Sequence, residues 1–95
     1  MIKISADHAQ TIALKALAFL AQDDDLLADF LNASGASPDE MKLRAQDADF
    51  LGFVLDFLMS DDSLARGFCQ AENLGAETLH LARAALPGGQ VPDWT

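Results

Sequence analysis

Histidine, cysteine and aspartate are the residues of this chain whose side chains could carry out chemistry. They are His8 and His80, the single Cys69, and two acidic runs, Asp23–Asp25 and Asp61–Asp62. A metal site needs several such ligands at matching spacing, and nucleophilic catalysis needs a base beside the nucleophile. No second His or Cys lies at helical spacing beside His8, and His80 falls on a separate predicted helix. The local sequence places no His or Lys to lower the pKa of Cys69. We therefore predict no catalytic, cofactor-binding or metal-binding residue, and a protein that is not an enzyme.

The two acidic runs are better explained as helix caps. Each comes where one apolar helical pattern ends and the next begins. An aspartate just before a helix accepts hydrogen bonds from free backbone N–H groups and complements the positive end of the helix dipole, which stabilises the helix by about 1 kcal/mol. Neither run has the alternating acids and the glycine of a calcium-binding loop. We predict that Asp24 or Asp62, or the acid next to each, caps its helix.

The composition predicts an all-α protein. Hydrophobic residues make up 51% of the 95 residues, and tyrosine is absent. Alanine and leucine lead while the β-branched Ile and Val are scarce, which favours helices over a sheet. A chain of this length suffices for one hydrophobic core, so we expect a single helical domain over residues 1–95.

The chain is strongly acidic, with a formal net charge of −9. Binding to phosphates depends on Lys and Arg, so nucleic acid and anionic membranes are poor partners. The acidity is explained by solubility, and the alternative is that the protein mimics nucleic acid toward a basic partner. The lone Cys69 cannot form an internal disulfide, which favours the reducing cytoplasm.

The most apolar stretch, FLGFVLDFLM at residues 50–59, has to be covered by protein. Its ten residues are too few to cross a bilayer, which needs roughly 20. Read as a helix, it carries one polar stripe made of Asp49, Gly52, Asp56 and Ser60. The cover must come from the other helices or from a second subunit, so we expect a monomer or a homodimer.

Five further helices are indicated around this stretch, at about residues 5–22, 25–35, 38–46, 62–73 and 76–86. The strongest local signal is SPDE, from Ser37, which forms a capping box with proline at the first helical position. The helix that begins there is short and weakly apolar, with Met41, Leu43 and Ala45. In the last helix, Arg83 is expected to face outward.

The chain also matches itself when it is shifted by 38 residues. LAFLAQDDDLLADFLNA, from Leu17, then aligns with LDFLMSDDSLARGFCQA, from Leu55, and nine of the 27 positions from Leu17 to Leu43 are identical. The shared residues are core positions and caps. We therefore predict two stacked three-helix units, at roughly residues 5–46 and 47–86, followed by a C-terminal tail at 87–95.

Three phrases, ALKALAFLAQDDDLLADFL, DADFLGFVLDFLMSDDSLARGF and ARAALPGG, resemble the short bacterial proteins of domain-of-unknown-function family 3572. The resemblance covers nearly the whole chain. Because the phrases are core and cap patterns, the resemblance implies a compact helical fold and no activity, and it transfers no functional residue. The chain departs from the family pattern at Gly67 and Cys69, where leucines are expected, and this bears on how tightly that helix packs.

We interpret the chain as a small acidic cytoplasmic protein-interaction or regulatory module without catalytic activity or cofactor, acting on an unidentified protein partner. The alternatives are the nucleic-acid mimic and a carboxylate metal-binding protein or enzyme. The one candidate partner-binding residue is Trp94. It lies in a tail whose PGG at residue 87 excludes a helix, yet Val91 and Trp94 supply apolar surface. We expect Trp94 to pack into an apolar groove of its own bundle, the alternative being a hook for a partner chain.

Overall fold

The computed structural model describes residues 4–86, and within this range the chain forms helices and no strands. The helices are α1 (Ala6–Ala21), α2 (Asp24–Ser34), α3 (Pro38–Arg44), α4 (Ala48–Met59), α5 (Asp62–Glu72) and α6 (Ala76–Ala84). The all-α prediction is confirmed. The candidate residue Trp94 lies outside the described residues.

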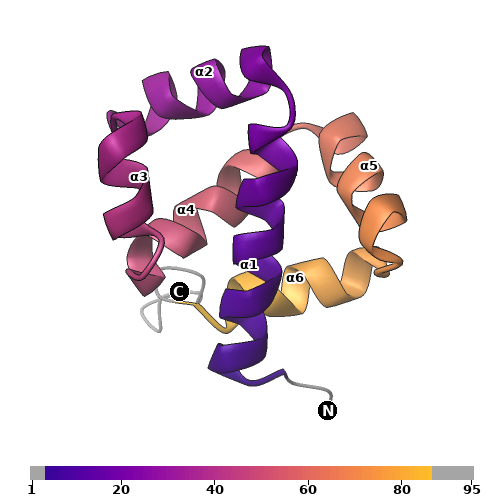
Figure 1. Cartoon of the computed structure of the whole chain (residues 1–95). Helices are drawn as coiled ribbons and strands as arrows, with labels where there is room; N and C mark the ends of the chain where they lie inside the picture. The colour runs from indigo at the N-terminus through magenta and orange to yellow at the C-terminus, as the bar shows by residue number, and fades with distance from the viewer. Residues whose placement is uncertain (1–3, 87–95) are drawn as a thin grey trace, which may run out of the picture.

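The helices are arranged around a central pair. α1 and α4 cross in the middle, with α2 and α3 to one side of the crossing and α5 and α6 to the other (Figure 1). α1 packs against α2, α4 and α6, and α4 also packs against α2, α5 and α6. Together, the two central helices therefore make extensive contacts with every other helix except the peripheral α3.

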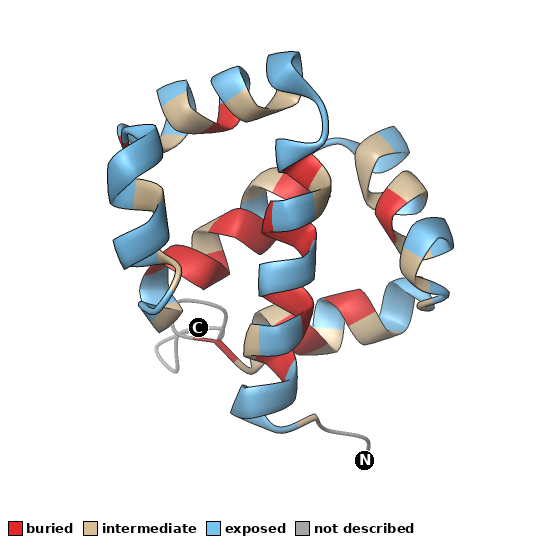
Figure 2. Ribbon diagram, in the orientation of Figure 1, coloured by how far each residue is buried: buried red, intermediate tan, exposed pale blue. Residues whose placement is uncertain are grey.

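The core forms where α1 and α4 meet, and Figure 2 shows the buried residues of both helices at this crossing. α1 buries three alanines, Ala9, Ala13 and Ala16, whose small side chains let the bulkier α4 approach closely. α4 buries six residues, among them Leu55 and Leu58, both at 0% exposure. The apolar stretch is thus covered mainly by the helices of its own chain.

Aromatic rings fasten the outer helices to this pair. The buried ring of Phe30 on α2 lies 5.4 to 5.7 Å, between centroids, from three phenylalanine rings of α4. On the other side, Phe68 of α5 meets Phe19 of α1 edge to face, with the centroids 5.5 Å apart. Such pairs stabilise packing by about 0.5–1.5 kcal/mol beyond the area they bury.

The predicted caps are confirmed. Asp23 accepts hydrogen bonds from two backbone N–H groups of α2 at 2.9 and 3.2 Å, and Asp61 does the same for α5 at the same distances. Ser37 and Glu40 form the reciprocal capping box at the start of α3. The backbone N–H of Ser37 donates to the Glu40 carboxylate, and this hydrogen bond lowers the pKa of Glu40.

The helix boundaries agree with the 38-residue shift seen in the sequence. α2 and α5 coincide at both ends, α1 and α4 coincide at their C-terminal ends, and α3 and α6 coincide at their first residues. The superposition of the two units remains a prediction. One pair clearly differs, because α6 buries Leu79 and Ala82 whereas α3 buries no residue.

The difference between α3 and α6 has a cause in the sequence. Arg44 of α3 stands at the position that corresponds to the fully buried Ala82 of α6. A charged side chain is costly to bury without a partner, so α3 stays at the surface. Leu43, which the sequence pattern places on the apolar face of this helix, is consequently 75% exposed.

Two expectations about α4 and α6 are corrected. Gly52 is buried and does not belong to the polar stripe of α4. The side chain of Arg83 was expected to face outward but is only 13% exposed. Its guanidinium donates to both carboxylate oxygens of Asp56, with Nε–Oδ1 at 2.6 Å and Nη2–Oδ2 at 2.9 Å. The apolar stem of arginine can be buried while its head reaches a carboxylate, which simple inward and outward patterning does not anticipate.

We expect Leu58→Ala to lower the free energy of unfolding by about 2–5 kcal/mol, because it leaves a cavity in the core. Asp56→Ala should lower it by about 1–2 kcal/mol, because the change removes the carboxylate from a largely buried guanidinium. Asp29→Ala, at an exposed position of α2, is the matched control and should change it by less than about 0.5 kcal/mol. Denaturant unfolding measures all three, and equal effects for Asp56→Ala and Asp29→Ala would contradict a structural role for the ion pair.

Gly67→Ala should raise the free energy of unfolding by about 0.5–1 kcal/mol, because alanine favours the helix interior more than glycine does. The added methyl group would lie 3.6 Å from Cζ of Phe19, an ordinary van der Waals contact. Gly35→Ala provides the contrast, since Gly35 has φ of 73° and the same change there should be destabilising. Thermal unfolding checks both, and a loss at Gly67 would show that α1 and α5 pack too tightly for the methyl group.

Candidate functional site

The residues that could carry out chemistry are not gathered into one site. His8 lies in the first turn of α1 and His80 lies in α6, both exposed. Within residues 4–86, no group of three or more His, Cys, Asp or Glu side chains could hold a metal ion. Asp23 and Asp61 are engaged as helix caps. These residues therefore form no recognisable catalytic or metal-binding constellation in the part of the chain that the structure describes.

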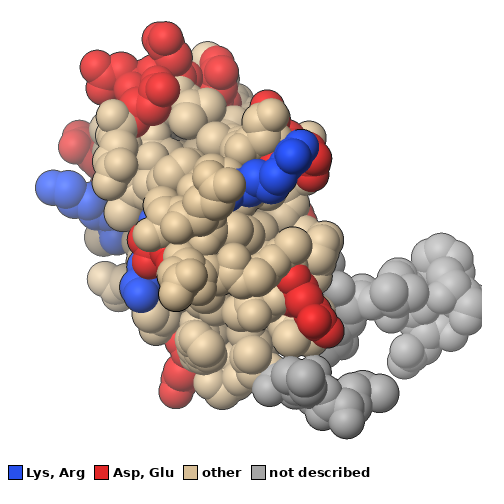
Figure 3. Space-filling model, turned by 90° about the vertical axis from the view of Figure 1, so that its right-hand side faces the viewer, with Lys and Arg blue, Asp and Glu red and all other residues tan. Residues whose placement is uncertain are grey.

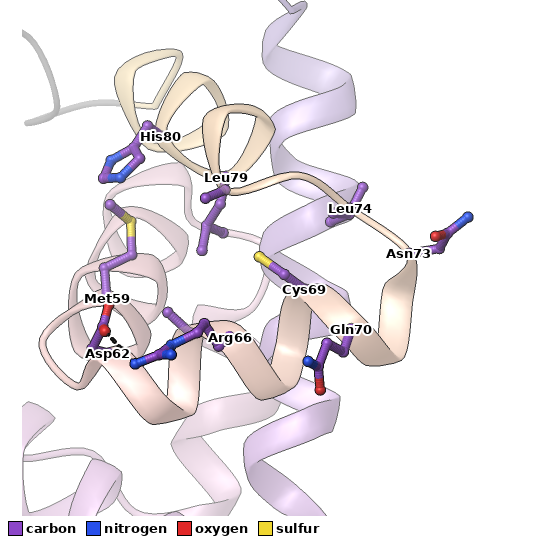
Figure 4. Close-up of a pocket in the computed structure, with 11 residues that line it drawn as sticks. Met59, Asp62, Arg66, Cys69, Gln70, Asn73, Leu74, Leu79 and His80 are labelled. Carbon is purple, nitrogen blue, oxygen red and sulfur yellow. Dashed lines mark hydrogen bonds and ion pairs between the residues drawn. The ribbon is translucent and has the colours of Figure 1, made fainter.

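A cleft lies between α5 and α6 and reaches the end of α4. Its volume is about 420 Å³, which lies within the roughly 300–1,000 Å³ of typical ligand pockets. Figure 4 shows that the side chains lining it come from α4, α5, α6 and the turn between α5 and α6. We call it the α5–α6 cleft.

The floor of the α5–α6 cleft is apolar. Leu79, fully within the core, and the half-buried Leu74 and Ala65 line it together with Met59. The thiol of Cys69 also lines the cleft. A surface of this kind favours an apolar side chain over a charged or strongly hydrated group.

The turn after α5 gives the cleft its shape. Asn73 takes the left-handed conformation, with φ of 56° and ψ of 43°, and ends α5. The backbone N–H of Leu74 then donates to the carbonyl of Cys69 at 2.8 Å, which closes a helix C-cap. This reversal lets α6 begin at Ala76, beside the face of α5 that carries Ala65 and Cys69.

The rim of the cleft is polar and exposed. Arg66 donates to Asp62 at 2.7 Å across one turn of α5, with side chains 71% and 85% exposed. Such a surface pair contributes only about 0.3–0.5 kcal/mol, so either group can exchange its partner for one on another molecule. Gln70 and His80 complete the rim, and both are exposed.

Cys69 is half-buried, and its burial raises the pKa of the thiol. A raised pKa lowers the fraction of thiolate, which is the nucleophilic form. This environment suits a small apolar residue packed against the core. The thiol contributes to the apolar lining of the cleft more readily than to nucleophilic chemistry.

The sequence contains a signal for this cleft, although on its own the signal indicates only a packing feature. Ala65 and Cys69 lie four residues apart on one face of α5, and Cys69 stands where a leucine was expected. Two small side chains on one helical face leave unfilled space unless the facing helix supplies bulk. The neighbouring start of α6 supplies Ala76, which is small as well. The hollow is the result.

Figure 3 shows the side on which α5 lies, where uncharged residues cover most of the middle of the face and acidic side chains gather at its upper end.

None of the helices in residues 4–86 has the length and hydropathy that a membrane-spanning helix needs.

Comparison with known proteins identifies a family but no activity. The family model described as "Protein of unknown function (DUF3572)" matches residues 6–89. This is the family that the core and cap phrases resemble. No curated protein and no solved structure matches the chain.

The raised pKa of Cys69 predicts slow alkylation. In the native protein, the rate of reaction with iodoacetamide should rise with pH through a midpoint above that of the same thiol in urea-unfolded protein, because less thiolate is present at each pH. The pH profile of labelling, followed by mass spectrometry in both states, measures the two midpoints. A native midpoint at or below the unfolded one would contradict the desolvated environment and reopen the question of a reactive thiol.

Proposed function

The chain belongs to the DUF3572 family of proteins of unknown function, and from the α5–α6 cleft we propose that it is a small cytoplasmic protein-interaction module without catalytic activity. The observation that carries the proposal is an exposed cleft with an apolar floor and a polar rim. Interfaces between proteins have this anatomy, with an apolar centre surrounded by polar residues that tolerate water. The occupant we propose is an apolar side chain of a partner protein.

The shape of the cleft supports a helical or extended partner segment. α5 and α6 flank the cleft and Leu79 closes its floor, an arrangement in which a single large apolar side chain can be surrounded on several sides. Amphipathic helices dock into grooves between helices by inserting such anchors at intervals of three or four residues. One well-buried anchor often contributes most of the binding energy.

The charge of the chain supports a basic partner segment. With a net charge of −9 the protein attracts cations, and this raises the rate at which basic segments encounter it. Asp62, at the rim, is 85% exposed and can pair with a Lys or Arg that flanks the apolar anchor. Added salt should therefore weaken the association.

The environment of the candidate chemical groups supports a non-catalytic role. An enzyme needs a nucleophile with its base, or an acid and base in reach of one substrate. Cys69 has a raised pKa, and the two histidines lie on different helices. Within the described residues, no buried side-chain nitrogen or oxygen lacks a hydrogen-bond partner.

A substitution that blocks the α5–α6 cleft should weaken binding of the partner protein. Gln70→Trp places a bulky side chain over the rim, and the matched control is Asn32→Trp, at the corresponding position of α2 and also exposed. Affinity capture from native extract, quantified by mass spectrometry, should enrich the same protein on the wild type and on Asn32→Trp but several-fold less on Gln70→Trp.

A purified partner then allows the interaction to be measured directly. Its dissociation constant for the wild type should rise with salt, and Gln70→Trp should weaken binding while leaving the thermal unfolding temperature unchanged. If all three proteins capture the same partners equally, the α5–α6 cleft is not the interaction site.

A further inference from the structure

A second hollow, of about 300 Å³, lies where α2, α3 and α4 meet. We call it the α3 groove. Its apolar lining comes from Ala33, Phe50 and Phe53, and its charged rim comes from Arg44, Asp47 and Asp49. It shares no lining residue with the α5–α6 cleft, so the occupant of the α3 groove is independent of the proposed function.

The α3 groove exists because the two halves of the chain are filled differently. In the second half α6 buries Leu79 and Ala82, whereas α3 buries no residue. Lys15 and Glu72 form an ion pair with a 3.6 Å contact. Under the 38-residue shift, Lys15 corresponds to Phe53 and Glu72 corresponds to Ser34. Where α1 and α5 have this ion pair, the corresponding helices α4 and α2 have a half-buried aromatic ring beside a hollow. Apolar surface of this kind is stabilised by being covered.

The chain has a segment available to cover it. Nine residues come after Leu86, and they include Val91 and the only tryptophan, Trp94. We propose that this C-terminal segment folds back over α4 and that Trp94 docks in the α3 groove of its own chain.

The C-terminal segment starts close to the α3 groove, because α6 ends beside α4. Arg83, in the last turn of α6, binds Asp56 of α4. Asp56 comes three residues after Phe53 on the same helix, a rise of about 4.5 Å. The eight residues from Pro87 to Trp94 can span up to about 26 Å when extended, so the groove is within reach. The α5–α6 cleft, in contrast, is lined by the opposite end of α6, at Ala76 and Leu79.

The lining of the groove fits the chemistry of an indole. The ring can pack against Phe50 and Phe53, which already belong to the aromatic cluster around Phe30. The guanidinium of Arg44, 46% exposed, can lie over the face of the ring in a cation–π contact. The indole N–H needs an acceptor, and the carboxylates of Asp47 and Asp49 stand at the rim. Apolar floor, cation and carboxylate are thus all present.

Tryptophan fluorescence tests the proposal, because Trp94 is the sole source of the signal. In dilute protein shown to be monomeric by light scattering, the emission should be blue-shifted relative to urea-unfolded protein and protected from acrylamide. Arg44→Ala should shift the emission toward red and increase quenching several-fold. Its matched control is Arg66→Ala, which removes an exposed arginine that is likewise paired with an acid one turn earlier.

A second pair of variants separates docking from general loss of structure. Phe53→Ala should expose Trp94, whereas Phe57→Ala, which removes another half-buried ring packed on Phe30, should leave its emission unchanged. A water-exposed spectrum in the monomer overturns the proposal. So does a spectrum that shifts only on association, which would place Trp94 on a second copy or a partner. The proposal is also overturned if Trp94 is protected from quenching but neither Arg44→Ala nor Phe53→Ala changes its emission, because the tryptophan then lies in a different groove.

Discussion

The close packing of α4 against the alanine-rich face of α1 is the contact on which the rest of the structure depends. α4 is apolar on almost every side, so it must be surrounded, and only small side chains on α1 allow two helices to cross at the centre of so short a chain. Once this crossing forms, the remaining helices need only cover its flanks. α2 does so through Phe30, and α5 does so through Phe68.

The two sides of the α1–α4 crossing are covered unequally, and this difference accounts for the α3 groove and the α5–α6 cleft. A single charged residue, Arg44, at the position of a buried alanine keeps α3 at the periphery and leaves a groove beneath it. On the other side α6 reaches the core, but small residues on α5 leave a cleft beside its first turn. Each hollow thus results from a few side chains that are too small or too polar for the position they occupy.

Most of the fold could be predicted from local chemistry. The caps at Asp23 and Asp61 and the capping box at Ser37 are decided within a few residues, and so the helix boundaries were readable from sequence. Long-range pairing was not. The bond between Asp56 and Arg83 joins positions 27 residues apart and inverts the expected orientation of the arginine. The cleft was missed for a similar reason, because hollows depend on how two helices are set against each other and not on the pattern of either one.

The packing of α1 against α6 has a consequence for the order in which the protein can fold. The first helix leaves the ribosome long before the last one is made, yet Ala82 and Leu86 complete the core that α1 begins. The contacts that close the structure therefore join the two ends of the described chain, and they have to wait until α6 has been synthesised. Until then the apolar faces of α1 and α4 can be covered only in part. The nascent chain should be a substrate for chaperones that hold exposed apolar helices, and truncation before α6 should produce aggregation instead of a smaller folded unit.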